Sequence, residues 1–353
     1  MFEHVADKGP MPASGRGELP RVSVVIPCLN RANFLVPTIE SVLRQDYPRI
    51  ECIVVDGGST DGTLDILARY EGRIKWLSEP DRGPPDAINK GWRMCNGEIL
   101  AWLNADDLWA PGAVSKAVAW FREHPGADVV YGDCGIIDGD GKCTSIACVR
   151  EWDLAYAVQY CDHVIYQAAS FIKRPILERV GWLYPKLLHD HELWLRISLS
   201  GGNICHVPTL LAYARHHEEN LGYRSDLVIP LKLEITRAFF DKPNLPASLL
   251  RLRNRAISNA YLRGVNCLFF DRFKCSRDIP RSLGLIAQAL KADRSNLLRI
   301  AQYLFQLWYW LAAMFLKRYL PVEVYEGLRA KKRRLVQALS LKNVFRPKGV
   351  EGS

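Results

Sequence analysis

Three polar side chains that could bind a metal ion follow one short apolar run. Residues 99–103 are continuously apolar, which is typical of a strand buried on both faces. Asn104, Asp106 and Asp107 come next, and Pro111 closes the loop. In open α/β sheets ligands bind at the carboxyl ends of the strands, and paired carboxylates there suit Mg²⁺ or Mn²⁺. The alternative is that one of the two aspartates only caps the next helix.

A glycine-rich turn follows another strand of the expected sheet. Residues 21–27 and 51–56 are apolar and β-branched, and helical spacing follows each of them, which predicts right-handed βαβ units. The turn 57–62 lacks the G-x-G-x-x-G spacing of dinucleotide-binding folds, which argues against an oxidoreductase. Asp56, at the end of its strand, is placed to accept hydrogen bonds from a nucleoside. A polar residue of the turn also serves as a plain helix N-cap.

The alternation of strands and helices changes in the second half of the sheet. A helix is expected over 113–123, a strand over 129–133 and a hairpin turn at 138–141. Later strands are expected over 166–173 and 210–214. The alternation of strand and helix breaks at the hairpin turn 138–141. We therefore expect an α/β fold with a mixed, Rossmann-like sheet and helices on both faces.

Histidines and acids gather at two later places in the chain. The sequence HDHE at 189–192 precedes an apolar helical pattern, so Asp190 falls in the first turn, where the helix dipole favours a carboxylate. The sequence RHH at 215–217 follows the last expected strand. A zinc site is the alternative interpretation, but no cysteines stand at zinc-binding spacing, which favours hydrogen-bonding or surface histidines.

Composition separates an acidic body from a basic C-terminal part. The chain has 353 residues, 48% of them hydrophobic, and a formal net charge of +9. Residues 241–353 contain 22 Lys and Arg against 7 Asp and Glu, whereas residues 1–240 contain 25 against 31. This asymmetry argues against a nucleic-acid-binding protein and indicates one basic surface. The ten cysteines are scattered without a CxxC pair, which favours buried thiols in a reducing, cytoplasmic compartment.

Three regions are expected: a flexible arm over 1–20 without a secretory signal, a catalytic domain over 21–240 and a basic helical region over 241–353. Residues 302–318 contain an apolar stretch of about 21 Å as a helix, too short for a hydrocarbon core of about 30 Å. Its aromatic residues and the basic cluster 331–334 favour an in-plane membrane contact. The alternative is an oligomer interface or packing on the catalytic domain.

Five short motifs, in this order and spacing, resemble those of the family 2 glycosyltransferases. They are VVIPCLN at 24–30, VDGGSTDG at 55–62, DAINKG at 86–91, LNADDL at 103–108 and DHELWLR at 190–196. The resemblance covers roughly residues 21–220. It implies a GT-A fold, a nucleotide-sugar donor with UDP as the first candidate nucleotide, a divalent metal (Mn²⁺ or Mg²⁺) and inversion at the anomeric carbon.

The first three motifs imply a nucleoside and sugar site. Asp56 matches the carboxylate at the nucleoside base, and Pro27 and Asn30 match the loop around it. Asp86 and Asn89 match a segment beside the nucleotide and the donor sugar. Pro84 and Pro85 stand in place of a more usual polar pair, which puts the shape of that loop in doubt.

The later motifs imply a diphosphate site. Asp106 resembles the residue near the ribose, and Asp107 the one that holds the metal on the diphosphate. Asn104 stands where many relatives carry the first acid of a D-x-D motif, which removes one charge. Arg215 and His217 match an Arg-x-His pair that closes over the diphosphate, and the histidine sometimes binds the metal.

Asp190 matches the general base of the family, which takes the proton of an acceptor hydroxyl. The Gln-x-x-Arg-Trp signature of processive members is absent, which favours one sugar per encounter. The hypothesis is an inverting glycosyltransferase at the inner face of the cell membrane, acting on a glycan or lipid-linked acceptor in surface polysaccharide synthesis. A catalytically silent nucleotide-sugar-binding scaffold and a nucleotidyltransferase are the alternatives, and the sequence does not set the oligomeric state.

Overall fold

The computed structural model describes residues 18–160, 165–184, 189–220, 224–269, 278–305 and Trp308. Most of the expected arm 1–20 therefore lies outside the described residues. So do most of the expected membrane-contact segment 302–318 and the whole of the basic cluster 331–334.

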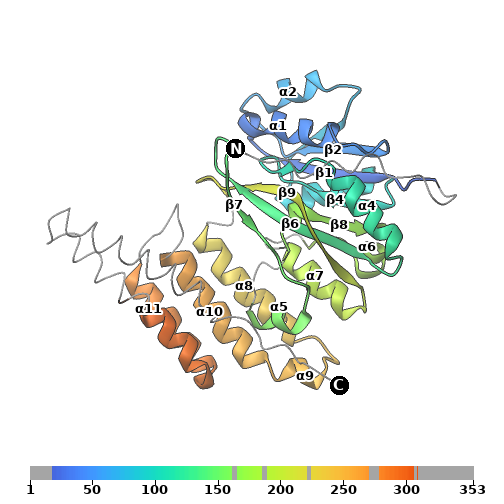
Figure 1. Ribbon diagram of the computed structural model, residues 1–353. Coiled ribbons are helices and arrows are strands. Elements are labelled where there is room, and N and C mark those ends of the chain that lie inside the picture. Colours follow the sequence, from blue (N-terminus) through green and yellow to red (C-terminus); the bar gives the residue numbers. More distant parts are fainter. Residues whose placement is uncertain are drawn as a thin grey trace, which may run out of the picture.

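One sheet of nine strands organises the described part of the chain (Figure 1). The strands are β1 (Val22–Cys28), β2 (Ile50–Asp56), β3 (Lys75–Ser78), β4 (Ile99–Trp102), β5 (Leu108–Trp109), β6 (Val129–Ile137), β7 (Cys143–Ala147), β8 (Ser170–Lys173) and β9 (Ile204–Arg215). Their order across the sheet is β3-β2-β1-β4-β8-β6-β9-β5, and β7 pairs with β6 outside this path.

The sheet is mixed, as the sequence predicts. Strands β3, β2, β1 and β4 are parallel neighbours. Strand β8 runs antiparallel to both β4 and β6, and β9 then lies parallel to β6. Strand β5 pairs antiparallel with the end of β9, which the sequence did not indicate, because a two-residue strand has no periodicity to recognise.

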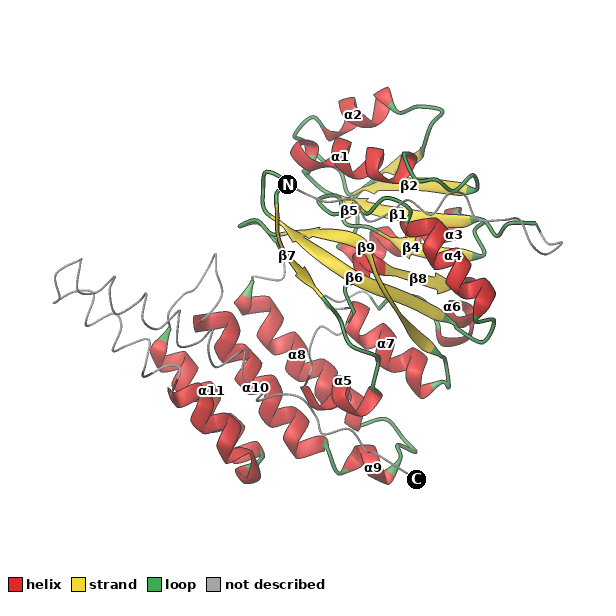
Figure 2. Cartoon of the chain, in the orientation of Figure 1, coloured by secondary structure: helices red, strands yellow, loops and turns green. Residues whose placement is uncertain are grey.

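Helices cover both faces of the sheet (Figure 2). They are α1 (Ala32–Leu43), α2 (Thr63–Arg69), α3 (Pro84–Met94), α4 (Ala113–Glu123), α5 (Leu154–Tyr160), α6 (Arg174–Val180), α7 (His189–Leu199), α8 (Ser225–Phe240), α9 (Ala247–Leu250), α10 (Arg253–Phe269) and α11 (Ile279–Ala292). The apolar sides of α1, α2 and α4 share one core with the sheet, and those of α3, α6 and α7 share the other.

Strand β1 shows how the sequence separates the two cores. Val24 and Ile26 belong to the core under α1 and α4, whereas Val25 belongs to the core under α3, because successive side chains alternate between faces. All three are fully buried. Trp92 of α3 lies in the same core as Val25 and donates its indole N–H to the carbonyl of Ala101 at 3.2 Å.

The C-terminal helices form a second layered group beside the sheet. Helix α10 packs between α8 and α11, as Figure 2 shows, and α5 joins this group to α7. Helices α9 to α11 confirm the expected helical character of the C-terminal region, over the part of it that the structure describes. Within the described ranges, no helix combines the length and the apolar content needed to cross a membrane.

Two strand predictions were partly wrong. Strand β9 begins at Ile204 instead of residue 210, because Pro208 interrupts the pattern at a place where the pairing with β6 shifts register. The expected strand over 166–173 is a 3₁₀ turn, η1 (Gln167–Ala169), followed by the shorter β8. Alanine has a low strand propensity, which fits the turn.

Gly91 sets the close approach of α3 to the sheet. A Cβ atom there would lie 2.5 Å from Cγ1 of Val25. We expect Gly91→Ala to lower the free energy of unfolding by about 1–3 kcal/mol through overpacking, measured by chemical denaturation. Gly126→Ala is the control, because a Cβ at Gly126 meets no atom within 4 Å. Equal stabilities of the two variants would contradict this packing.

Candidate active site

Four loops meet at the carboxyl ends of the strands, and these loops together with the ends of their strands contain most of the predicted site residues. The loops follow β1, β2, β4 and β9, over residues 29–31, 57–62, 103–107 and 216–220. The parallel arrangement of β2, β1 and β4 places the first three side by side. Side-chain hydrogen bonds then link the fourth loop to the third.

Asp56 holds the glycine-rich loop in shape. Its Oδ2 accepts hydrogen bonds from the backbone N–H of Gly58 and of Ser59, both at 3.0 Å, and from the Ser78 hydroxyl at 2.7 Å. Its Oδ1 accepts the Ser59 hydroxyl. The carboxylate is fully buried, so a nucleoside base would have to replace one of these local partners.

The first loop is tied to the second. Asn30, in the left-handed backbone region at φ 52°, accepts the N–H of Thr60 on its side-chain oxygen at 2.8 Å. Its own N–H donates to the Ser59 hydroxyl at 2.7 Å. Pro27 is half-buried one residue before the end of β1. The structure therefore brings together three predicted nucleoside residues, Pro27, Asn30 and Asp56, on adjacent strands.

Asp86 and Asn89 have different surroundings on α3. Asp86, in the first turn, accepts the backbone N–H of Arg82 at 3.1 Å, and the hydrogen bonds from Arg82 hold the pKa of this carboxyl below its usual value. Asn89 is buried and both ends of its amide bond the backbone of Leu183, at 2.8 and 3.1 Å. Its geometry is that of a residue that positions the chain before α7.

The two aspartates after β4 have separate partners. Asp107 is 4% exposed: Oδ1 accepts the backbone N–H of Arg215 at 2.9 Å, and Oδ2 accepts the Asn104 amide at 3.0 Å. Gln167 approaches the same Oδ2 at 3.4 Å. Burial and the neighbouring Asp106 charge raise the pKa of Asp107 well above its usual value. Asp107 thus lies inside the wall of the site.

Asp106 faces the loop after β9. Its Oδ2 lies 2.9 Å from Nε2 of His217, and Nδ1 of the same ring accepts the N–H of Glu219 at 3.3 Å. The Phe34 ring packs against the His217 ring at 4.9 Å between centroids. A carboxylate oxygen and an imidazole nitrogen therefore stand side by side. No group of three or more His, Cys, Asp or Glu side chains able to hold a metal occurs among the described residues.

Arg215 braces the site from within. It is 4% exposed, and its Nε donates to the carbonyl of Asp106 at 2.9 Å. Its Nη1 lies 3.0 Å from the carbonyls of both Asp138 and Gly139, in the turn before β7. The guanidinium is thereby largely committed to backbone oxygens, although the sequence predicted that it would face the diphosphate.

Asp190 lies in the first turn of α7, as predicted, and is half-buried. Glu192 in the same turn is engaged by Arg196 at 2.9 Å, and Arg196 also donates to the carbonyls of Val180, Gly181 and Trp182. For Asp190 the described part of the chain offers no ion pair or hydrogen bond to its side chain. One turn further along α7, Trp194 stacks on Trp102 at the end of β4, at 5.9 Å. This contact places α7 against the strand that precedes the acidic loop.

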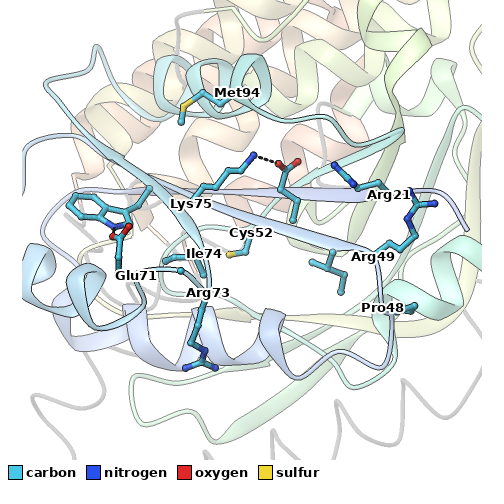
Figure 3. Close-up of a pocket in the computed structure, with 13 residues that line it drawn as sticks. Arg21, Pro48, Arg49, Cys52, Glu71, Arg73, Ile74, Lys75 and Met94 are labelled. Carbon is cyan, nitrogen blue, oxygen red and sulfur yellow. Dashed lines mark hydrogen bonds and ion pairs between the residues drawn. The ribbon is translucent and has the colours of Figure 1, made fainter.

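A hollow of about 910 Å³ lies at the opposite edge of the sheet, where β1, β2 and β3 begin (Figure 3). Lys75 and Glu51 form an ion pair of 2.6 Å across it, and Glu51 also accepts the Ser23 hydroxyl. Trp76 donates to Glu71 at 2.8 Å. These polar groups bond one another. Because the hollow lies at the amino ends of the strands, it is separate from the candidate active site at their carboxyl ends.

Residues 23–148 match the family model described as glycosyl transferase family 2. Over these residues the chain carries the sequence pattern of the family 2 glycosyltransferases. The resemblance found in the sequence motifs is therefore confirmed.

Curated relatives are similar over the same region. The chain is 34% identical over 214 residues to a glycosyltransferase of Nostoc, covering 58% of this chain and 64% of the relative. It is 30% identical over 187 residues to one of Rickettsia prowazekii, covering 50% and 58%. A glycosyltransferase of Mycobacterium bovis described for PGL/p-HBAD biosynthesis is 38% identical over 119 residues, covering 32% and 46%. The chain thus spans less than two thirds of the length of these relatives.

Solved structures share the fold. Staphylococcus aureus TarS 1-349 in complex with UDP-GlcNAc superposes with a TM-score of 0.56 at 16% identity, over 77% of this chain and 81% of that one. The mannosyltransferase PcManGT of Pyrobaculum calidifontis, in complex with GDP-Man and Mn²⁺, superposes with a TM-score of 0.55 at 21% identity, over 96% and 91%. The predicted GT-A fold with a helical C-terminal region is confirmed.

The sequence reasoning missed several residues at this edge. Ser59 and Ser78 complete the Asp56 cluster, Phe34 packs on His217, and Gln167 reaches Asp107. Arg31 lies beside Asp106, at 4.0 Å. Among these residues, only Arg31 could have been suggested by the sequence, because it directly follows the first motif, which ends at Asn30.

Proposed function

We propose that this protein is an inverting glycosyltransferase that moves a sugar from a nucleoside-diphosphate sugar to an acceptor hydroxyl. The observation that carries the proposal is the meeting of the Asp56 loop and the Asp106–His217 pair at one edge of the sheet. Helix α7 packs against β4, the strand that leads into the acidic loop. This edge is where ligands bind in such sheets. The two superposed structures contain UDP-GlcNAc and GDP-Man, so UDP and GDP sugars are the donors to try first.

Asp106 and His217 are proposed to hold a divalent cation, Mn²⁺ or Mg²⁺, on the donor diphosphate. Their oxygen and nitrogen atoms lie 2.9 Å apart, which fits two ligands of such an ion. When bound, the ion would offset charge on the leaving group. The sequence favoured Asp107 for this role, but the hydrogen bonds to both of its oxygens favour Asp106.

Asp190 is proposed as the general base. A carboxylate in the first turn of α7 is held by a helix whose apolar side is fixed in the core, so its position is well defined. It would accept the proton of the acceptor hydroxyl as that oxygen attacks the anomeric carbon. A single displacement with one base and no enzyme nucleophile inverts the configuration. Arg215 and Asn89 support the site by holding backbone, and Pro27, Asn30, Asp56 and Asp86 are proposed around the nucleotide.

The acceptor is proposed to be a glycan or lipid-linked glycan presented at a membrane. Leu298, Phe305 and Trp308 are exposed apolar side chains, with exposed fractions of 90%, 63% and 63%. Ile300 and Tyr303, close to them in the chain, are buried in the core of the C-terminal helices. Apolar and aromatic side chains on a basic region are typical of an in-plane membrane contact.

The metal ligand is tested by calorimetric titration of UDP and GDP with Mn²⁺ or with chelator. We expect Asp106→Asn to remove the Mn²⁺ dependence of nucleotide affinity, because its carboxylate is proposed to contact the ion. Asp107→Asn is expected to keep that dependence. The reverse result, with Mn²⁺ dependence lost only in Asp107→Asn, would restore the assignment made from the sequence.

The base is tested by transfer assays with the donors that bind. Asp190→Asn is expected to lower turnover about 10²–10⁴-fold, the usual contribution of a general base, while nucleoside diphosphate affinity stays unchanged. Asp65→Asn is the control, because Asp65 occupies the first turn of α2 and tests a helix-dipole effect alone. Near-normal turnover of Asp190→Asn would exclude this role. A wild-type chain that binds donors but neither transfers nor hydrolyses them would indicate a silent binding protein.

The membrane contact is tested by sedimentation of the full chain with vesicles of phosphatidylcholine, with and without phosphatidylglycerol. Replacing Phe305 and Trp308 by Ser is expected to lower the bound fraction, because both side chains would leave the apolar interface. Leu64→Ser is the control, since Leu64 is an exposed leucine of α2 at the distant end of the molecule. Binding that is absent in the wild type, or equal in all variants, would rule the contact out.

A further inference from the structure

Arg31 lies at the open side of the candidate active site. It is the N-cap residue of α1, directly after the loop residue Asn30. Its Nε is 4.0 Å from Oδ2 of Asp106, the same oxygen that contacts His217. Its side chain is 23% exposed, so the guanidinium is held by the protein and still reaches solvent.

Arg31 differs from Arg215, the other arginine of the site, in how much of its guanidinium the protein already uses. Arg215 follows the family pattern in sequence, but its Nε and Nη1 donate to backbone carbonyls of Asp106, Asp138 and Gly139 inside the wall. Arg31, in contrast, bonds one backbone carbonyl, that of Asn30 at 3.1 Å. The remaining donors of its planar guanidinium suit two phosphate oxygens at once.

The guanidinium of Arg31 already forms an ion pair with one carboxylate, that of Glu219. Glu219 Oε2 lies 2.9 Å from Nη1 of Arg31, and the Glu219 side chain is 69% exposed. An ion pair this exposed contributes little to stability. It joins the loop after β1 to the loop after β9, and the backbone N–H of Glu219 also contacts His217. The pair is thus connected to both sides of the Asp106–His217 contact.

We propose that Arg31 binds the diphosphate of the nucleotide, and that Glu219 occupies Arg31 when no nucleotide is present. This inference rests on the proposed function, because it takes the diphosphate of a nucleoside-diphosphate sugar as the ligand. A diphosphate presents more negative charge and more acceptor oxygens than one carboxylate, so it displaces Glu219 from the guanidinium. Displacement frees the loop 216–220 from the loop after β1 at the moment the donor enters.

The first test measures affinity for UDP, UMP, GDP and GMP in the presence of Mn²⁺ by calorimetry. Arg31→Ala is expected to weaken nucleoside diphosphate binding about tenfold to a hundredfold, the range expected for hydrogen bonds between charged groups. The loss for the monophosphate is expected to be smaller. Arg31→Lys should recover part of the affinity. Arg44→Ala is the control, because Arg44 forms a comparable exposed ion pair with Glu40 on α1.

The second test asks whether Glu219 competes with the ligand. Glu219→Gln is expected to tighten nucleoside diphosphate binding about twofold to fivefold, since the strength of an exposed ion pair limits the gain. Glu218→Gln is the matched control: it removes the same charge one residue away. In the Arg31→Ala background, Glu219→Gln is expected to have no further effect, because Glu219 acts through Arg31.

The outcomes separate this inference from the proposed function. If the wild type binds no nucleoside diphosphate, the proposed function fails and the inference fails with it. If the wild type binds UDP or GDP but Arg31→Ala, with an unchanged thermal unfolding curve, binds equally well, only the role of Arg31 is wrong. Equal effects of Glu219→Gln and Glu218→Gln would overturn the competition.

Discussion

The hydrogen bond from the backbone N–H of Arg215 to Oδ1 of Asp107, at 2.9 Å, is the constraint on which the site depends. It joins the loop after β4 to the end of β9, two segments far apart in the chain. Arg215 also donates a second hydrogen bond, from Nε to the carbonyl of Asp106. The loop after β4 and the end of β9 are therefore joined at two points. Thr38 of α1 supports the same loop, with its hydroxyl 3.0 and 2.9 Å from the carbonyls of Ala105 and Asp107. Asp106 is thereby presented to His217 on a rigid frame.

This frame explains why adjacent, similar residues have different roles. Asp107 is turned inward and its charge is met by N–H donors, whereas Asp106 is turned toward the loop after β9. Arg215 is buried on backbone oxygens, and Arg31 reaches solvent. In both pairs one member is bound to the protein frame, and the other is the one proposed to contact the ligand. Motif similarity cannot separate the two members, because the distinction comes from which way each side chain points.

The sequence predicted what depends on local pattern. Helix α4 was expected over 113–123 and is found as Ala113–Glu123, and Asp190 falls in the first turn of α7 as expected. The features that the sequence did not predict depend on contacts between residues far apart in the chain. Strand β5 exists only because β9 passes beside it, and Asn89 bonds Leu183, which lies 94 residues away in the chain. The Arg31–Glu219 pair spans 188 residues, and no periodicity within either segment indicates it.

Strand β9 comes late in the sequence, and this limits where the chain can be truncated without breaking the sheet. The matched family region ends at residue 148 and contains every loop from the first half of the sheet. Strand β6, inside that region, is hydrogen-bonded on one side to β8 and on the other to β9, both of which come later. A fragment cut at residue 148 would lose β9 along one whole edge of β6, and β8 along residues 129–131 of the other edge, where β7 covers only residues 134–137. It would also lose the partner of β5. Such a piece would hold the recognisable signature of the family without a closed sheet, and its unpaired strands would make it prone to aggregate. The physical folding unit is therefore longer than the region that the family model matches.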